Sequence, residues 1–84
     1  MRPMEDQTFR IEDIYVPAKR RRTLDPETVK VIAESMLEEG QRMPILVRRD
    51  GERLVLVEGF HRLEACRSLG EETITGLIVQ ARRK

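Results

Sequence analysis

The sequence predicts a small α+β domain with the element order β-α-β-β-α-β. Three observations support this class: strand-type runs near both ends, two helix-type patterns with start and stop signals, and a hairpin signal between them. Eighty-four residues suffice for one domain, and two Phe, one Tyr and no Trp imply a mainly aliphatic core. By pattern alone a ferredoxin-like sandwich is expected, although other α+β arrangements of the same order stay open.

The first strand is expected over residues 9–16, and Pro17 ends it. Its apolar positions are Phe9, Ile11, Ile14 and Val16. The residues from Lys19 to Arg22 are expected to form a basic loop. We treat 1–84 as a single domain whose polar ends, residues 1–8 and 82–84, are flexible and solvated.

A first helix begins at Asp25-Pro26-Glu27. Asp25 can accept hydrogen bonds from the free N–H groups, Pro26 fits the first helical position, and Glu27 suits the positive end of the dipole. Gly40 is the expected stop. One apolar stripe, expected to face the core, contains Val29, Ile32, Ala33, Met36 and Leu37.

The second half of the chain contains a hairpin, a helix and a strand. The strands Ile45–Val47 and Arg53–Val57 flank a two-residue turn signal, Asp50-Gly51, whose central positions both need positive φ. The second helix is expected from about His61 to Leu69, and the last strand from Thr73 to Ala81.

Composition limits the classes of function. Sixteen basic and fifteen acidic residues nearly cancel, so a nucleic-acid partner would have to bind a local patch. The single Cys excludes an internal disulfide, and no zinc-type cluster of Cys and His is present. No apolar run approaches membrane-spanning length and no signal core precedes the domain, so we expect a cytoplasmic protein with no membrane partner.

The junction between the strand that ends near Val57 and the helix that begins near His61 is the most informative feature. A strand-Gly-helix turn presents the free backbone N–H groups and the positive dipole end of a helix, which favour an anion. His61 and Arg62 add side-chain donors beside Gly59. The residues therefore predict a phosphate-binding turn.

Three blocks of sequence resemble the ParB/sulfiredoxin superfamily: Leu24–Val29, Gly40–Arg48 and Val57–Ala65. The first block matches the start of the first helix, and the second matches a ParB pattern, Gly-x-x-x-Pro-Ile-x-Val-Arg. The third resembles both the ParB box Gly-Glu-Arg-Arg-x-x-Ala and the sulfiredoxin motif Gly-Gly-Cys-His-Arg. The resemblance implies a ParB-like N-terminal domain with a mixed sheet. It also implies CTP or ATP, with magnesium, whose phosphates lie on the turn from Gly59 to Arg62.

The candidate nucleotide- or phosphate-binding residues are Gly59, Phe60, His61, Arg62, Arg20, Arg21, Arg22 and Ser35. The three arginines before the first helix could clamp a phosphate, contact a nucleic-acid backbone, or simply be solvated. Phe60 could pack in the core or stack on a base. Ser35 matches a hydroxyl residue that touches the nucleotide in sulfiredoxins, although an ordinary helix-face role fits equally well.

Three departures separate this chain from the proteins that it resembles. The nucleophilic Cys of sulfiredoxins is replaced by Phe60, and a Lys early in their first helix by Thr28, so reduction of a sulfinic acid is not expected. The chain is also too short for the helix-turn-helix and dimerisation segments that follow this domain in ParB proteins. Cys66, on the apolar side of the second helix, is expected to be a buried structural thiol.

A stand-alone domain that binds a nucleotide or another phosphate ligand is the leading hypothesis, with no catalytic residue and no protein-bound metal assigned. A module that meets DNA, as in ParB-like and nuclease-like relatives, or an acidic protein is one alternative. A phosphoryl-transfer enzyme is another, with Glu58 as the candidate carboxylate. We find no cluster of carboxylates of the kind that a two-metal nuclease uses.

Overall fold

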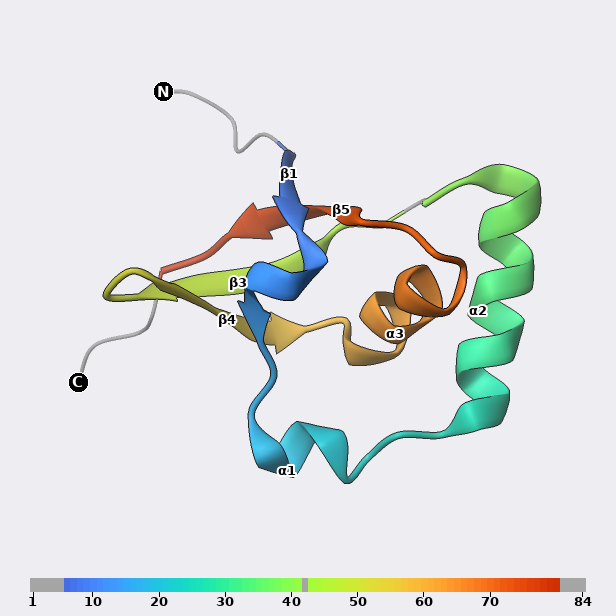
Figure 1. Cartoon of the computed structure of the whole chain (residues 1–84), viewed down its shortest axis with the longest axis horizontal. Coiled ribbons are helices and arrows are strands. Elements are labelled where there is room, and N and C mark those ends of the chain that lie inside the picture. The colour runs from blue at the N-terminus through green and yellow to red at the C-terminus, as the bar shows by residue number, and fades with distance from the viewer. Residues whose placement is uncertain (1–5, 42, 81–84) are drawn as a thin grey trace.

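The computed structural model of the protein describes residues 6–41 and 43–80, in which a mixed sheet is combined with helices (Figure 1). In chain order the elements are β1 (Gln7–Arg10), the 3-10 helix η1 (Ile11–Asp13), β2 (Ile14–Tyr15), α1 (Ala18–Arg21), α2 (Pro26–Glu39), β3 (Ile45–Asp50), β4 (Arg53–Glu58), α3 (Phe60–Ser68) and β5 (Thr73–Ile78). The α+β class is confirmed.

The strands form one five-stranded sheet in the order β1-β5-β3-β4-β2. The pairs β1–β5 and β3–β4 are antiparallel, whereas β3–β5 and β2–β4 are parallel. The mixed sheet that the resemblance implies is therefore confirmed. The ferredoxin-like sandwich expected from the pattern alone is wrong, because the first part of the chain supplies both edge strands of this sheet.

The first predicted strand, residues 9–16, is in fact two strands joined by η1. Its β1 part also includes Gln7 and Thr8, which belong to the end expected to be flexible. Ile11 and Ile14 are both buried, and their spacing of three residues fits the period of a 3-10 turn and not the alternation of a strand. The backbone N–H of Ile11 donates to the carbonyl of Glu72 (3.0 Å), which anchors the turn beside β5.

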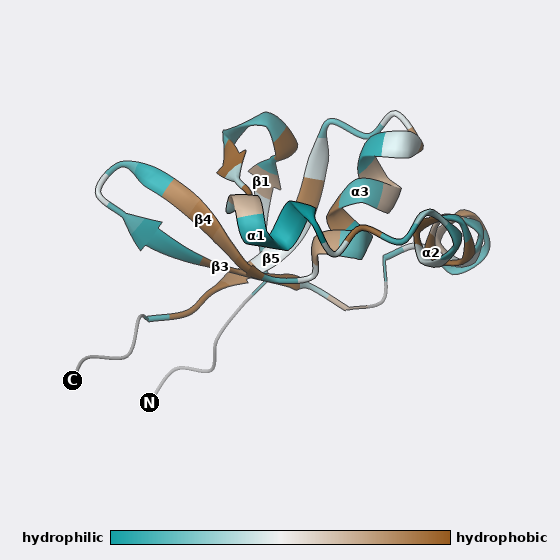
Figure 2. Ribbon diagram, turned by 90° about the horizontal axis from the view of Figure 1, so that it is seen from below, coloured by the Kyte–Doolittle hydropathy of each residue, from teal (hydrophilic) through white to brown (hydrophobic). Residues whose placement is uncertain are grey.

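The hydrophobic core lies between the sheet and α3. Its buried members are Ile11, Ile14, Val16, Ile45, Val47, Leu56, Phe60, Leu63, Cys66 and Ile74. Helix α2 lies beyond α3 and packs mainly on it, away from the sheet, as the two views in Figures 1 and 2 both show. In the described part of the chain no helix has the length and apolar character needed to cross a membrane.

Helix α2 begins and ends where its sequence signals predict. The Asp25 carboxylate accepts the Glu27 backbone N–H (3.2 Å), and Gly40, with φ of 77°, ends the helix. The predicted burial of its whole apolar stripe is wrong, because Ala33 is buried whereas Leu37 is 72% exposed. A helix that packs on one other helix, and not on a sheet, buries only a narrow strip of its surface.

Three smaller differences concern the hairpin, the second helix and the last strand. Asp50 pairs with Arg53, so the central residues of the turn are Gly51 and Glu52, and of these only Gly51 has positive φ (66°). The second helix is one residue earlier than predicted, at Phe60–Ser68. Strand β5 ends at Ile78; the predicted end at Ala81 and the tail at 82–84 lie outside the described residues.

Gly59, between β4 and α3, lies against the fully buried Ile45 of β3. Its φ of 107° is one that side-chain-bearing residues rarely adopt, and a Cβ there would lie 2.7 Å from Cγ2 of Ile45. Gly76 of β5 approaches the same side chain, since its Cβ would lie 3.0 Å from Cγ1 of Ile45. The start of α3 is therefore placed by close packing on β3.

Gly59→Ala should lower the free energy of unfolding by about 2–5 kcal/mol, because backbone strain adds to overpacking against Ile45. Gly70→Ala is the matched control: Gly70 also has positive φ (81°), but nothing lies within 4 Å of its added Cβ. It should cost about 1 kcal/mol. Urea unfolding of both variants makes the comparison, and equal losses would contradict the packing argument.

Candidate functional site

The start of α3 presents backbone donors without a side-chain cap. Gly59 occupies the N-cap position, and the first helical bond joins the Leu63 N–H to the Gly59 carbonyl (2.9 Å). The N–H groups of Phe60, His61 and Arg62 therefore precede the helical ladder. No acidic residue lies in this first turn, so the positive end of the dipole is not offset locally. This geometry favours an anion.

His61 joins this turn to the start of α2. Its Nε2 accepts the backbone N–H of Asp25 at 3.1 Å. The Asp25 carboxylate in turn accepts the Glu27 N–H (3.2 Å) and the Thr28 hydroxyl (2.9 Å). The first turns of α2 and α3, which are far apart in the sequence, are thus linked through one imidazole ring.

The predicted basic loop is wrong in part, because Ala18–Arg21 form the short helix α1. The Pro17 carbonyl accepts the N–H groups of Arg20 (2.9 Å) and Arg21 (3.3 Å), and alanine, lysine and arginine are good helix formers. The guanidinium of Arg20 donates to the carbonyl of Val57, two residues before Gly59. One of the three candidate arginines therefore contacts the end of β4.

A cavity of about 550 Å³ brings two further candidates together, Arg62 of α3 and Ser35 of α2. The remaining lining is largely apolar and consists of Val31, Ile32, Met36, Gly40 and Met43. Val31 and Met43 are 62% and 60% exposed, so the cavity opens at the surface beside exposed apolar side chains. An apolar wall with a few polar groups is typical of small-molecule sites.

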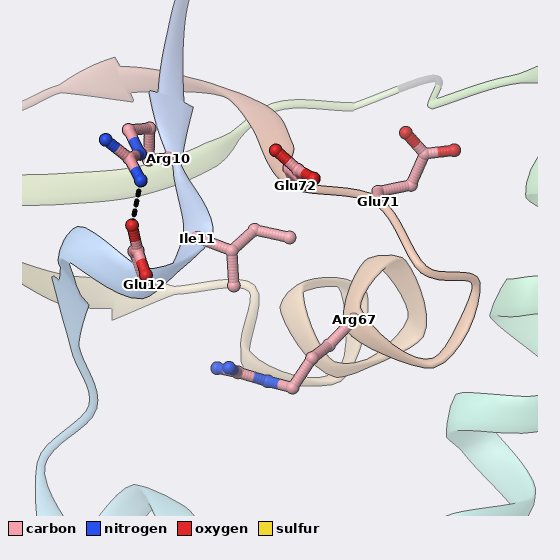
Figure 3. Close-up of a pocket in the computed structure, with 6 residues that line it drawn as sticks. All are labelled: Arg10, Ile11, Glu12, Arg67, Glu71 and Glu72. Atoms are coloured by element: carbon pink, nitrogen blue, oxygen red, sulfur yellow. Dashed lines mark hydrogen bonds and ion pairs between the residues drawn. The ribbon is translucent and has the colours of Figure 1, made fainter.

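Arg21 lies apart from this cavity. It lines a second one, of about 470 Å³, together with Phe60, Glu64 and Arg67 of α3. At 100° per residue these three α3 positions face away from Arg62. A neighbouring cavity of about 390 Å³, between η1 and the residues that follow α3, shares Arg67 and is shown in Figure 3. Arg22 is the exposed C-cap residue of α1.

Phe60 belongs to the core, with 7% of its surface exposed. Its ring is tilted by 58° against the His61 ring, with 5.6 Å between the centroids. The structure therefore favours packing as the role of this side chain over stacking on a nucleobase. Its backbone N–H remains one of the donors at the start of α3.

The sequence did not reveal the contact of Asp25 with His61 or the apolar cavity walls. Asp25 was recognisable only as a helix cap, and nothing in its local pattern indicates a partner in α3. The apolar wall could have been suspected at Val31 and Met43, because both are large apolar residues outside the stripe expected to face the core.

Glu58 is exposed at the end of β4, and among the described residues no group of His, Cys, Asp or Glu is suited to hold a metal ion.

Cys66 is 2% exposed, which confirms the predicted buried thiol. Burial raises the pKa of this thiol, and the nearby Glu71 carboxylate raises it further, whereas Arg62 acts in the opposite direction. The thiolate is therefore disfavoured, and Cys66 is a packing residue with low nucleophilicity.

The ParB N-terminal domain family matches residues 4–84 of the sequence. No curated protein matches the chain. Among solved structures, sulfiredoxin from Arabidopsis thaliana is 30% identical with a TM-score of 0.83, over 92% of this chain and 86% of that protein. The chain is thus similar to nearly the whole of that sulfiredoxin.

Two larger proteins contain the same fold. The C-terminally truncated chromosome-partitioning protein ParB from Caulobacter crescentus, complexed with CTP-γ-S, is 26% identical (TM-score 0.74), over 95% of this chain and 46% of that one. A free serine kinase in complex with AMP is 18% identical (TM-score 0.79), over 93% of this chain and 32% of that one. The chain spans less than half of either, and the likeness to the kinase shows the fold alone.

The pKa of the Cys66 thiol leads to a prediction about its alkylation by iodoacetamide. Because the raised pKa lowers the thiolate fraction and burial blocks access, alkylation of the folded protein near neutral pH should be at least about tenfold slower than that of the chain unfolded in guanidinium chloride. The unfolded chain is the control, since it carries the same single thiol. Similar rates in both states would show that Cys66 is accessible.

Proposed function

The chain belongs to the ParB N-terminal domain family, within the ParB/sulfiredoxin superfamily, and we propose that it binds a nucleotide whose phosphates lie on the turn between β4 and α3. The observation that carries this proposal is the uncapped start of α3, placed by Gly59 and flanked by Arg20, His61 and Arg62. Family members and neighbours of the same fold bind CTP-γ-S or AMP, which supports a nucleotide as the ligand.

The phosphates would be held by backbone and side-chain donors together. The N–H groups of Phe60, His61 and Arg62 supply the helix-terminus contacts. The guanidinium of Arg62 supplies charge from α3 and that of Arg20 supplies charge from α1. Arg20 already donates to the Val57 carbonyl. A guanidinium has five N–H donors, so Arg20 would have further donors to offer a phosphate.

The base and ribose would occupy the 550 Å³ cavity that Arg62 and Ser35 line. Its volume falls in the range of small-molecule sites, about 300–1,000 Å³. The side chains of Val31 and Met43 offer apolar and polarisable surface to a base, and Ser35 offers a hydroxyl group. CTP and ATP both fit this description. Magnesium would accompany the triphosphate, since Mg²⁺ is commonly bound through phosphate oxygens.

Phe60 argues against sulfinic acid reduction, the reaction of sulfiredoxins, as the activity of this chain. A benzyl side chain has no atom that can form a covalent phosphoryl or sulfinyl intermediate, and this one lies in the core. The nearest thiol in the sequence, Cys66, is buried with a raised pKa. We therefore assign nucleotide binding, without the sulfiredoxin reaction, to this chain.

The exposed side of α1 favours a second candidate, contact with DNA or an acidic protein. Arg21 and Arg22 lie outside the proposed nucleotide site and remain available to such a partner. Binding of duplex DNA would then weaken steeply with salt, because each phosphate contact releases counterions.

Phosphoryl transfer is a third candidate. If the protein hydrolyses a nucleotide and Glu58→Gln leaves the rate unchanged, Glu58 is excluded as the catalytic carboxylate.

Arg62→Ala should weaken the binding of CTP or ATP by about 10–100-fold, because a charge-assisted hydrogen bond contributes about 1.5–3 kcal/mol. Arg67→Ala is the matched control on the same helix: Arg67 faces the other side and pairs with Glu64 (3.4 Å). It should change the affinity less than about twofold. Isothermal titration calorimetry with magnesium measures both, and a wild-type protein that is folded yet binds neither nucleotide would refute the proposal.

A further inference from the structure

Within the described part of the chain, the side chain of Gln41 makes three hydrogen bonds, all of them to backbone groups. Its Nε2 donates to the carbonyls of Met43 (2.8 Å) and Thr75 (2.9 Å), and its Oε1 accepts the Thr75 N–H (2.9 Å). We propose that this amide is a spacer between Met43 and β5, and that Gln41 thereby positions Met43 for contact with the base of the nucleotide. This inference rests on the proposed function, because it concerns the cavity assigned there to the base and ribose.

The three partners fix the orientation of the Gln41 amide. The oxygen must face the Thr75 N–H, and the NH₂ group has two hydrogens, one for each carbonyl. Gln41 and Thr75 are both partly buried, so the backbone groups would be costly to leave unpaired. A side-chain amide has the same kind of donor and acceptor as a peptide group, and here it takes the place that strand backbone would occupy beside Thr75.

The register of the parallel strands β3 and β5 shows what the amide replaces. Near the end of β5 the Val79 N–H donates to the Val47 carbonyl (2.8 Å). Hydrogen bonds of a parallel pair recur every second residue on each strand. Four residues back along both segments, the corresponding groups are the Thr75 N–H and the Met43 carbonyl. The side-chain amide lies between these two groups, accepting from the first and donating to the second.

The inserted amide keeps Met43 out of the sheet. Strand β3 begins only at Ile45, and Met43 is 60% exposed where it lines the 550 Å³ cavity with Ser35 and Arg62. The lining of this cavity comes from α2, α3 and the segment between α2 and β3. A direct hydrogen bond from the Thr75 N–H to the Met43 carbonyl would therefore draw Met43 toward β5 and away from the cavity.

Gln41 reaches the nucleotide site only through Met43. The side chains of Gln41 and Thr75 border a different cavity, of about 450 Å³, whereas Met36 and Gly40 border both. Gln41 is thus a positioning residue and not a ligand contact. Its loss should weaken the contacts of the base and leave those of the phosphates, which depend on the turn between β4 and α3.

Gln41→Leu removes the donors and the acceptor and leaves a neutral side chain of similar size. Gln80→Leu is the matched control, because Gln80 is exposed beyond β5. Calorimetry with ATP, CTP and pyrophosphate, each with magnesium, should show about tenfold weaker nucleotide binding by Gln41→Leu, with pyrophosphate binding changed less than about twofold. Gln80→Leu should leave all three affinities within about twofold of the wild type.

Two results of this titration would overturn the inference. One is an unchanged affinity of folded Gln41→Leu for both nucleotides. The other is an equal loss for nucleotides and pyrophosphate, because a merely structural role of Gln41 would weaken the whole site. If the wild-type protein binds none of the three ligands, it is the proposed function that fails.

Two measurements on the wild-type protein test the inference without the variant. In the free protein, the side-chain NH₂ of Gln41 should exchange with solvent at least about tenfold more slowly than that of Gln80, and equal rates would overturn the spacer. The methyl signal of Met43 should shift with ATP and CTP but not with pyrophosphate. A methyl signal that bound nucleotide leaves unchanged would overturn the role of Met43. Slow exchange without binding of any ligand would refute the proposed function and leave the spacer standing.

Discussion

The contact of Gly59 with Ile45 is the constraint on which the candidate site depends. Ile45 is fully buried in β3, and the absence of a side chain at Gly59 lets the end of β4 approach it closely enough to begin α3 at once. The same approach excludes a conventional Ser, Thr or Asp cap at this position. Packing in the core thus leaves the backbone donors of the first turn available at the surface, and a phosphate can use them.

The rest of the site is held against this turn by contacts between distant segments. Arg20 contacts the last part of β4, and Asp25 contacts His61, so α1 and the start of α2 both lie over the junction. Arg62 of α3 lines the cavity beside Val31 and Ser35 of α2, whereas Arg67 lines the cavities beside η1 and a further one beside Pro26 at the start of α2. The two arginines of α3 therefore line different cavities.

Local signals in the sequence predicted the features that depend on local physics. The Asp25 cap, the Gly40 stop and the strand-Gly-helix turn at Gly59 all follow from backbone chemistry within a few residues. The features that failed depend on tertiary packing: the chain crosses from one sheet edge to the other at η1, and Leu37 stays exposed because α2 packs on α3. In the candidate site, too, local features were predictable and tertiary ones were not. The turn at Gly59 could be predicted, whereas the separation of Arg21 from Arg62 could not, because it depends on how α1 lies against α3.

An amide NMR titration with CTP, ATP and pyrophosphate, each with magnesium, would show whether phosphates bind at the turn between β4 and α3. We predict the largest shifts at residues 59–63, with smaller shifts at Arg20 and, for the nucleotides alone, at Val31 and Ser35. Pyrophosphate should reproduce the shifts at the turn without those in the cavity. A well-dispersed spectrum without shifts, or shifts confined to the residues around Arg67, would contradict this prediction.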